Sequence, residues 1–201
     1  MSAHDLSGRH ALVCGASRGI GQAAAIAIAE LGAEMTVLAR SEGPLVTLVR
    51  ELEARGAKAA RILVADLDDH DGLLSALRAH LAAFGPIHVV VNNTGGPPGG
   101  PLVEAEPSAI MAAIHRHLIA AHLIMQEVLP GMREAGFGRF VQVLSTSVRE
   151  PIPNLGVSNL TRAAVAGWAK TLSRELPPGV TINNVLPGFT DTKRLSELGS
   201  G

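Results

Sequence analysis

Three glycines in the stretch CGASRGIG have a spacing that could bind a phosphate. Gly15, Gly19 and Gly21 follow a short apolar run and precede a segment with helical periodicity. Glycine permits positive φ and close backbone approach, so amide N–H groups at a helix start can face a pyrophosphate. The Gly-x-x-x-Gly-x-Gly spacing differs from the usual dinucleotide fingerprint, and a plain turn is the alternative. The position between a strand and a helix favours nucleotide binding.

The elements that must position this turn alternate along the chain. Apolar runs predict strands at 10–14, 35–39, 60–66, 87–93, 138–145 and 179–187, and helical periodicity predicts helices near 20–31, 44–55, 70–84, 107–132 and 155–176. This alternation predicts an α/β fold: a doubly wound parallel sheet in a Rossmann-like three-layer α/β/α arrangement. No linker or repeat divides the chain, so one domain is expected over 1–201.

The run at 179–187 is expected to form an apolar edge strand. Proteins usually cover or pair such an edge. We therefore expect a further element of the chain or a partner to cover it. One possibility is that the sheet lacks its last strand within this sequence.

Composition restricts the class of protein. Of 201 residues, 47% are hydrophobic and 17% charged, as in a globular chain, and the net charge is −1 with dispersed basic residues. This excludes the charge pattern of a nucleic-acid or membrane-surface protein. The single Cys14 excludes an internal disulfide, the N-terminus has no signal-peptide apolar region, and no uninterrupted apolar run reaches membrane-spanning length. We expect a cytoplasmic protein without a metal site.

Several motifs occur in a fixed order. After CGASRGIG come VADLDD, NNTG at 92–95, Ser145 after the fifth predicted strand, and LPGFTDT at 186–192. With these motifs the chain resembles the short-chain dehydrogenase/reductase family from Leu6 to about Arg194, and most closely its 3-oxoacyl-carrier-protein reductase-like branch. The family usually has Asn-Asn-Ala-Gly where this chain has NNTG.

The resemblance implies that a nicotinamide dinucleotide binds across these motifs. Gly15, Ser17, Arg18, Gly19, Ile20 and Gly21 would hold the pyrophosphate and adenosine ribose, Asp66 and Leu67 would border the adenine, Asn93 and Gly95 would line the ribose, and Pro187, Gly188 and Thr192 would face the nicotinamide. A strand-ending turn is the alternative role of Asn93, since Asn suits such turns.

The end of the second predicted strand bears on which nicotinamide binds. An acidic residue there would grip a 2′-hydroxyl, whereas arginine suits a 2′-phosphate. The family's Asp position holds Ala39, and Arg40 follows it. Arg18 could approach the same phosphate. Two guanidiniums without a competing carboxylate favour NADP(H) over NAD(H); the alternative is that Arg40 is a solvated loop residue.

The reaction centre departs from the family. The resemblance implies a Ser that holds the substrate oxygen, a Tyr that exchanges its proton, a Lys four residues later, and an Asn on the central helix. Ser145 matches the first role. The Tyr, Lys and Asn positions hold Ser158, Arg162 and His117, and the chain contains no Tyr.

These changes alter the expected chemistry. Ser158 and Arg162 at i and i+4 share a helix face and are expected to point into one pocket. An aliphatic hydroxyl is a far weaker acid than a phenol, and a guanidinium stays protonated near pH 7. Because histidine titrates near neutrality, His117 is the candidate proton donor. His115 and His122 are expected to be simple surface or interface residues, and Ser145 could instead end a strand in a turn.

Two functions remain open. The first is NADP(H)-dependent reduction of a carbonyl or oxidation of an alcohol by an atypical member of the family. The second is a non-catalytic NADP(H)-binding protein, a sensor or regulatory subunit, and a flavin binder is a weaker third. The resemblance also implies a homodimer or homotetramer formed through the helices around 107–132 and 155–176. The small residues of AAVAGWA would permit this contact, although packing on the sheet within one chain explains them equally well.

Overall fold

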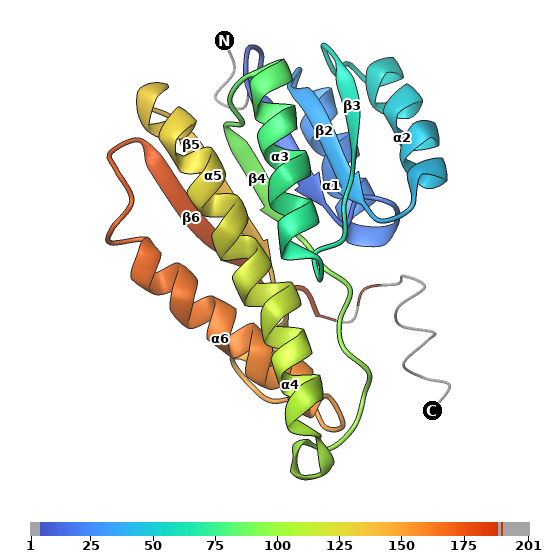
Figure 1. Ribbon diagram of the computed structural model, residues 1–201, viewed down its shortest axis with the longest axis vertical. Coiled ribbons are helices and arrows are strands. Elements are labelled where there is room, and N and C mark those ends of the chain that lie inside the picture. The colour runs from blue at the N-terminus through green and yellow to red at the C-terminus, as the bar shows by residue number, and fades with distance from the viewer. Residues whose placement is uncertain (1–4, 189, 191–201) are drawn as a thin grey trace.

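The sheet is built from runs of Val, Leu, Ile and Ala that are buried on both faces, as a parallel sheet requires. The protein is described by a computed structural model for residues 5–188 and 190. All strand pairs in it are parallel, and the order is β3-β2-β1-β4-β5-β6 (Figure 1). The strands are β1 (His10–Cys14), β2 (Glu34–Ala39), β3 (Ala60–Val64), β4 (Val89–Asn92), β5 (Gly138–Val143) and β6 (Val180–Val185).

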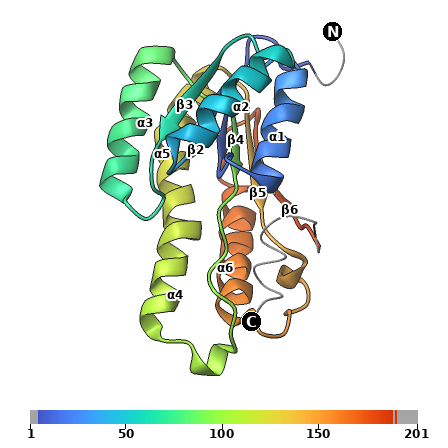
Figure 2. The ribbon, with the colours of Figure 1, turned by 90° about the vertical axis from the view of Figure 1, so that its right-hand side faces the viewer.

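Helices cover both faces of this sheet (Figure 2). Their bounds are α1 (Gly19–Glu30), α2 (Glu42–Ala54), α3 (His70–Phe84), α4 (Pro107–Ile114), α5 (Ala120–Glu134) and α6 (Gly156–Leu172). Apolar residues of α1 and α2 form one core with alternate strand residues, and those of α3, α5 and α6 form the other. The predicted three-layer, doubly wound fold is confirmed.

The strand order creates a crevice at the carboxyl ends of β1 and β4. The chain leaves β1 toward β2 on one side, and β4 begins the other half of the sheet against β1. In such sheets the loops that follow these two strands diverge, and ligands bind between them. Here those loops carry the glycine turn and the stretch 93–101.

The longest helix is interrupted where the sequence predicted regular α-helix. Pro107 starts α4, α5 ends at Glu134, and the five residues between them, His115–Ile119, form the π-helical turn η2. By length and composition the 28-residue helix could cross a membrane, although it is not the uninterrupted apolar run that the sequence analysis considered, since Arg116 and Glu127 interrupt it. The core helix of a globular protein passes the same test, and this helix packs against α3 and α6.

Most predicted boundaries agree to within two residues. The predicted ranges of β1 and α3 coincide with the structure. Strand β3 is shorter than predicted because its last two predicted residues belong to the following loop, and β4 begins two residues later and ends one residue earlier than predicted. Strand β6 lies at the sheet edge, as predicted, with Val180 and Ile182 buried and Val185 half exposed.

Candidate functional site

The glycine turn connects β1 to α1 in a conformation suited to an anion. Gly15 and Gly19 have φ of +59° and +60°, and a Cβ on Gly15 would lie 2.5 Å from the carbonyl oxygen of Asn93. Arg18 precedes the first turn of α1 in an extended conformation, makes no side-chain cap, and no acidic residue occupies that turn. The first-turn amides are therefore available to a phosphate.

Asn93 holds this turn against β4. Its Nδ2 donates to the carbonyl oxygens of Gly15 and Cys14, at 3.2 and 3.4 Å. A Cβ on Gly21 would lie 2.7 Å from the same nitrogen. Asn93 thus has a structural role beside any contact with a ribose. Burial raises the pKa of the Cys14 thiol to about 12, so this cysteine is a packing residue.

The remaining predicted coenzyme contacts differ in their surroundings. Gly95 and Gly188 are exposed, Ser17 is half-buried, and Ile20 and Leu67 pack against the two apolar cores. The Pro187 carbonyl oxygen accepts from the Thr146 amide at 3.1 Å. Thr192 lies outside the described residues.

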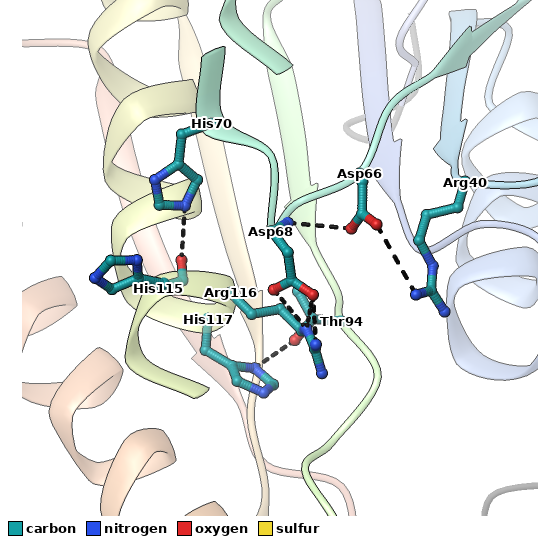
Figure 3. Close-up of polar contacts among 8 residues, drawn as sticks. All are labelled: Arg40, Asp66, Asp68, His70, Thr94, His115, Arg116 and His117. Atoms are coloured by element: carbon teal, nitrogen blue, oxygen red, sulfur yellow. Dashed lines mark hydrogen bonds and ion pairs between the residues drawn. The ribbon is translucent and has the colours of Figure 1, made fainter. Parts of the chain in front are cut away.

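Arg40 lies beside a carboxylate, contrary to the sequence analysis. Its guanidinium is 4.0 Å from Asp66, whose side chain is 41% exposed, while that of Arg40 is 72% exposed (Figure 3). The expectation of no competing carboxylate was wrong because the loop after β3 lies next to the end of β2, a proximity that sequence distance conceals. At this exposure the pair is weak.

The π-helical turn carries His117 into the interior. The imidazole is 4% exposed, and its Nδ1 is hydrogen-bonded to the hydroxyl of Thr94 in the loop after β4 (Figure 3). Burial, then the charges of Arg162 and Arg116, lower the pKa of His117 to about 3, and Asp68 only partly opposes them. The expectation that this group titrates near neutrality was wrong, because desolvation disfavours the imidazolium.

Two contacts join the π-helical turn to the first residue of α3 and to the loop before it (Figure 3). Arg116 forms a forked ion pair with Asp68, with Nε donating to the two carboxylate oxygens at 2.9 and 3.0 Å. The hydrogen bond from Arg116 lowers the pKa of Asp68. His70 Nε2 lies 3.2 Å from the carbonyl oxygen of His115, and the two rings stack.

The other two histidines of this helix differ from each other, and only His115 has the exposure expected of a surface residue. His115 is exposed, and His122 is half-buried and accepts from Trp168 Nε1 at 3.2 Å.

The three other residues that the resemblance assigns to the reaction centre make different contacts in the structure. Arg162 donates to the carbonyl oxygens of Val143 at 2.8 Å and Thr94 at 3.4 Å, so it joins the ends of β5 and β4. Ser145 Oγ accepts from the Ser147 amide at 3.1 Å and caps the short 3-10 turn η3 (Thr146–Val148), which is its alternative role. Ser158 is half-buried in the first turn of α6.

A small cavity of about 10 Å³ lies behind these groups. Its polar lining consists of Asn92, Thr94, Arg116, His117, Gln142 and Arg162. The cavity thus brings together His117 and Arg162, but among the described residues Ser145 and Ser158 do not line it. The pocket predicted for Ser158 and Arg162 together is not this one.

Sequence reasoning missed Asn92, Thr94 and Gln142 as cavity residues. Two signals were available: Thr94 stands where the resemblance implies Ala, and Gln142 interrupts an apolar run that is buried on both faces of the sheet. In the part of the chain that the structure describes, no cluster of three or more His, Cys, Asp or Glu could hold a metal.

Comparison with known proteins agrees with this geometry. Residues 9–201 match the short chain dehydrogenase family. The chain is 32% identical over 189 residues to 2,3-dihydroxy-2,3-dihydro-p-cumate dehydrogenase of Pseudomonas putida, covering 94% of this chain and 73% of the relative. It is 33% identical over 196 residues to the 3-oxoacyl-[acyl-carrier-protein] reductase of Pseudomonas aeruginosa, covering 96% and 78%.

A solved structure shows the same architecture. The 3-oxoacyl-(acyl-carrier-protein) reductase of Agrobacterium tumefaciens C58, with NADP bound, superimposes with a TM-score of 0.89 at 27% identity, over 96% of this chain and 75% of the other.

Proposed function

Since this chain belongs to the short-chain dehydrogenase family, we propose that it is an NADP(H)-dependent oxidoreductase that reduces a small-molecule carbonyl or oxidises the corresponding alcohol. The glycine turn carries this proposal. Its two left-handed glycines and the uncapped first turn of α1 fit a pyrophosphate.

The residue types along the crevice support this proposal. Amides from Gly15 to Gly21, with Ser17, Arg18 and Ile20, would hold the pyrophosphate, Asp66 and Leu67 would border the adenine, and Asn93, Gly95, Arg162, Pro187, Gly188 and Thr192 would line the nicotinamide half. When bound, the coenzyme supplies or accepts the hydride. The exposed backbone of Gly95 and Gly188 leaves room for a close approach, because a Cβ at either position would meet no atom within 4 Å.

The preference for NADP(H) rests on Arg40 and Arg18. Arg40 is mostly exposed and its pairing with Asp66 is long, so a 2′-phosphate would compete for it. Similar proteins that bind NADP support this choice. We expect Arg40→Ala to weaken NADPH binding about tenfold, the worth of one charge-assisted hydrogen bond, and to leave NADH binding unchanged. Equal losses for both coenzymes would contradict the assignment.

The catalytic residues differ from the usual set. We propose that Ser145 holds the substrate oxygen and that Arg162 binds the coenzyme. Ser158 and His117 stand in place of the usual Tyr and Asn. With its low pKa, His117 is neutral at pH 7 and acts by hydrogen bonding. Loss of a positioned acid lowers the rate about 10²–10⁴-fold. Holding the hydride donor and acceptor together still lowers the barrier by about 7–11 kcal/mol, so slow turnover without the usual Tyr is expected.

A second candidate is a non-catalytic NADP(H)-binding protein, a sensor or regulatory subunit. It is favoured by Ser158 and Arg162, which cannot exchange protons as Tyr and Lys do. Calorimetry with NADPH, followed by turnover assays on ketones and acyl thioesters, separates the two. Oxidation of NADPH at a rate that saturates with the concentration of a substrate supports the enzyme. Tight binding without oxidation supports the second function, and a folded protein that binds no NADPH overturns both.

The double variant Ser158→Tyr with Arg162→Lys tests the assignment of the reaction centre. We expect it to raise turnover by about tenfold or more, because it restores a proton donor of suitable acidity. An unchanged rate in a folded variant that still binds NADPH would show that the pair is misassigned.

We also propose that the protein is a cytoplasmic homodimer or homotetramer. A groove of about 560 Å³ lies between the start of α6 and the loop before α4, lined by apolar side chains that include Leu102, Ile152 and Leu160. Val103 in that loop and Met111 in α4 are 94% and 52% exposed. We expect light scattering to give a dimer or tetramer and Met111→Lys to shift it toward monomer; a monomeric wild type would refute this part.

A further inference from the structure

Three buried nitrogen atoms on different elements border the same cavity without a protein partner. Asn92 ends β4, Gln142 lies in β5 and His117 in the π-helical turn, and they are 8%, 1% and 4% exposed. Among the described residues nothing is hydrogen-bonded to Asn92 Nδ2, Gln142 Nε2 or His117 Nε2. Each such atom costs about 1–3 kcal/mol if it stays unsatisfied.

The cavity can satisfy all three with one small molecule. Its volume of about 10 Å³ corresponds to a single water molecule. The Cys14 thiol lies 3.9 Å from Asn92 Oδ1, which leaves the amide NH₂ group of Asn92 as the unpartnered part of that side chain. Gln142 likewise presents an NH₂ group. An occupant must therefore accept two hydrogen bonds.

The imidazole supplies the third contact. Its neutral form has one protonated nitrogen, and Nδ1 already faces the Thr94 hydroxyl. The other groups near the ring are the cations Arg162 and Arg116 and the ion-paired Asp68. A water molecule that accepts from the two NH₂ groups has no lone pair left for a third N–H donor, but it can still donate to an unprotonated Nε2. The cavity therefore favours His117 with Nε2 unprotonated.

We propose that this cavity binds one water molecule, which accepts from Asn92 and Gln142 and donates to His117 Nε2, and that this water fixes the imidazole as its Nδ1–H tautomer. In this tautomer the ring donates to Thr94 Oγ1. The hydroxyl hydrogen of Thr94 must then point away from His117. Thr94 is half-buried in the loop that borders the crevice, so its hydroxyl becomes a directed donor toward whatever binds there.

The tautomer is measured by ¹⁵N NMR on histidine-labelled protein without coenzyme. We expect a protonated Nδ1 and an unprotonated Nε2 for His117 near pH 7. Gln142→Met, which keeps the side-chain length but removes the donor, should shift the Nε2 signal, and a water peak should be present in the cavity of wild-type crystals. Ser147→Ala, a control that removes a buried hydroxyl outside this cavity, should leave the signal unchanged.

A protonated Nε2 in the wild-type protein overturns the proposal. An Nε2 signal that is the same in wild type and in a folded Gln142→Met variant also overturns it. Because the wild-type measurement needs no substitution, a variant that fails to fold does not remove the test.

The role of Thr94 as a donor rests on the proposed oxidoreductase function. We expect Thr94→Val to lower kcat about tenfold, the worth of one hydrogen bond, with NADPH affinity unchanged and Thr94→Ser restoring the rate. Unchanged kcat in Thr94→Val refutes the donor role. If the tautomer is as expected but wild type shows no turnover, the proposed function fails while the water site stands.

Discussion

Two Thr–His pairs lie at opposite ends of the same sheet, and they differ in what surrounds them. At the amino ends of the strands, Thr36 Oγ1 lies 2.7 Å from His10 Nε2 and 2.8 Å from His80 Nε2. At the carboxyl ends, the Thr94 hydroxyl is bonded to His117 Nδ1. Both pairs contain a buried imidazole whose pKa is lowered by burial.

At the amino end the hydroxyl is enclosed, although His10 Nδ1 beside it is also a buried nitrogen without a partner among the described residues. Thr36 is fully buried between two rings, so its hydroxyl donates to one imidazole and accepts from the other. One ring must therefore be the Nδ1–H tautomer and the other the Nε2–H tautomer. The carboxyl-end pair is open on both sides, since Thr94 borders the crevice and His117 borders the cavity. Thr and His thus stabilise the fold at the amino end of the sheet. At the carboxyl end they orient a hydroxyl group toward the crevice.

The largest expected effect comes from breaking the amino-end pair. Thr36→Val removes the partner of two buried imidazole nitrogens, and we expect a loss of roughly 2–5 kcal/mol in the free energy of unfolding, at about 1–3 kcal/mol for each stranded group. Urea unfolding measures it. Thr94→Val is the matched control, and it should cost roughly half as much because one nitrogen loses its partner. Equal losses would mean that the two ends do not differ in this way.

A pH titration of stability compares the two ends in one protein. Burial, then the nearby His80 and Arg61, lower the pKa of His10 to about 4, against the opposing charge of Glu34, and that of His117 is about 3. The unfolded chain binds protons from about pH 6.5, whereas the folded chain does not until these lower values. The stabilisation is therefore complete above about pH 6.5 and is lost as the pH falls toward 4.

We expect each histidine to account for about 2 kcal/mol of unfolding free energy lost between pH 7 and pH 5. Urea unfolding of His10→Gln and His117→Gln over this range separates the two contributions. Each variant should remove about 2 kcal/mol of the change. His80 and His88, whose pKa is also lowered by burial, account for part of what remains. If either variant alone removes the whole dependence, the two clusters are not independent.

The smallest expected effect is at the ion pair beside the open end. Arg116 and Asp68 are each about one-third exposed, and such pairs contribute about 0–1 kcal/mol. Asp68→Asn should therefore lower the free energy of unfolding by less than about 1 kcal/mol. It should also lower the pKa of His117 further, because Asp68 is the group that raises it, and NMR titration measures that shift. A rise in the pKa of His117 would show that the effect of the Asp68 charge on the ring is wrongly assigned.

The fold was largely predictable because its signals are local. Apolar runs predicted all six strands, and the 3.6-residue period predicted α3 with both ends correct. Helix ends elsewhere moved by one or two residues, which is the usual uncertainty, except that α6 ends at Leu172, four residues before its predicted end. The π-helical turn was not predictable, because HRHLI fits an α-helical period as well as a π-helical one.

The site was predictable only where a single segment forms it. The glycine turn is such a segment. The proximity of Arg40 to Asp66 and the convergence of Asn92, Gln142 and His117 depend on which strands lie side by side, and neither can be derived from spacing. The pKa of His117 depends on burial, which is a property of the tertiary structure.

The π-helical turn makes the position of one imidazole depend on a single inserted residue. A π turn arises when a helix gains one residue without losing the packing on either side, and such insertions occur often at functional sites. Deleting one residue between 115 and 119 would restore regular winding and rotate one flank by about 100° relative to the other. His117 would then no longer contact Thr94. The two ends of the helix could keep their present contacts only if one end rotated relative to the other. In a sequence alignment of relatives, a one-residue gap at this point would therefore separate proteins that carry this buried pair from those that do not.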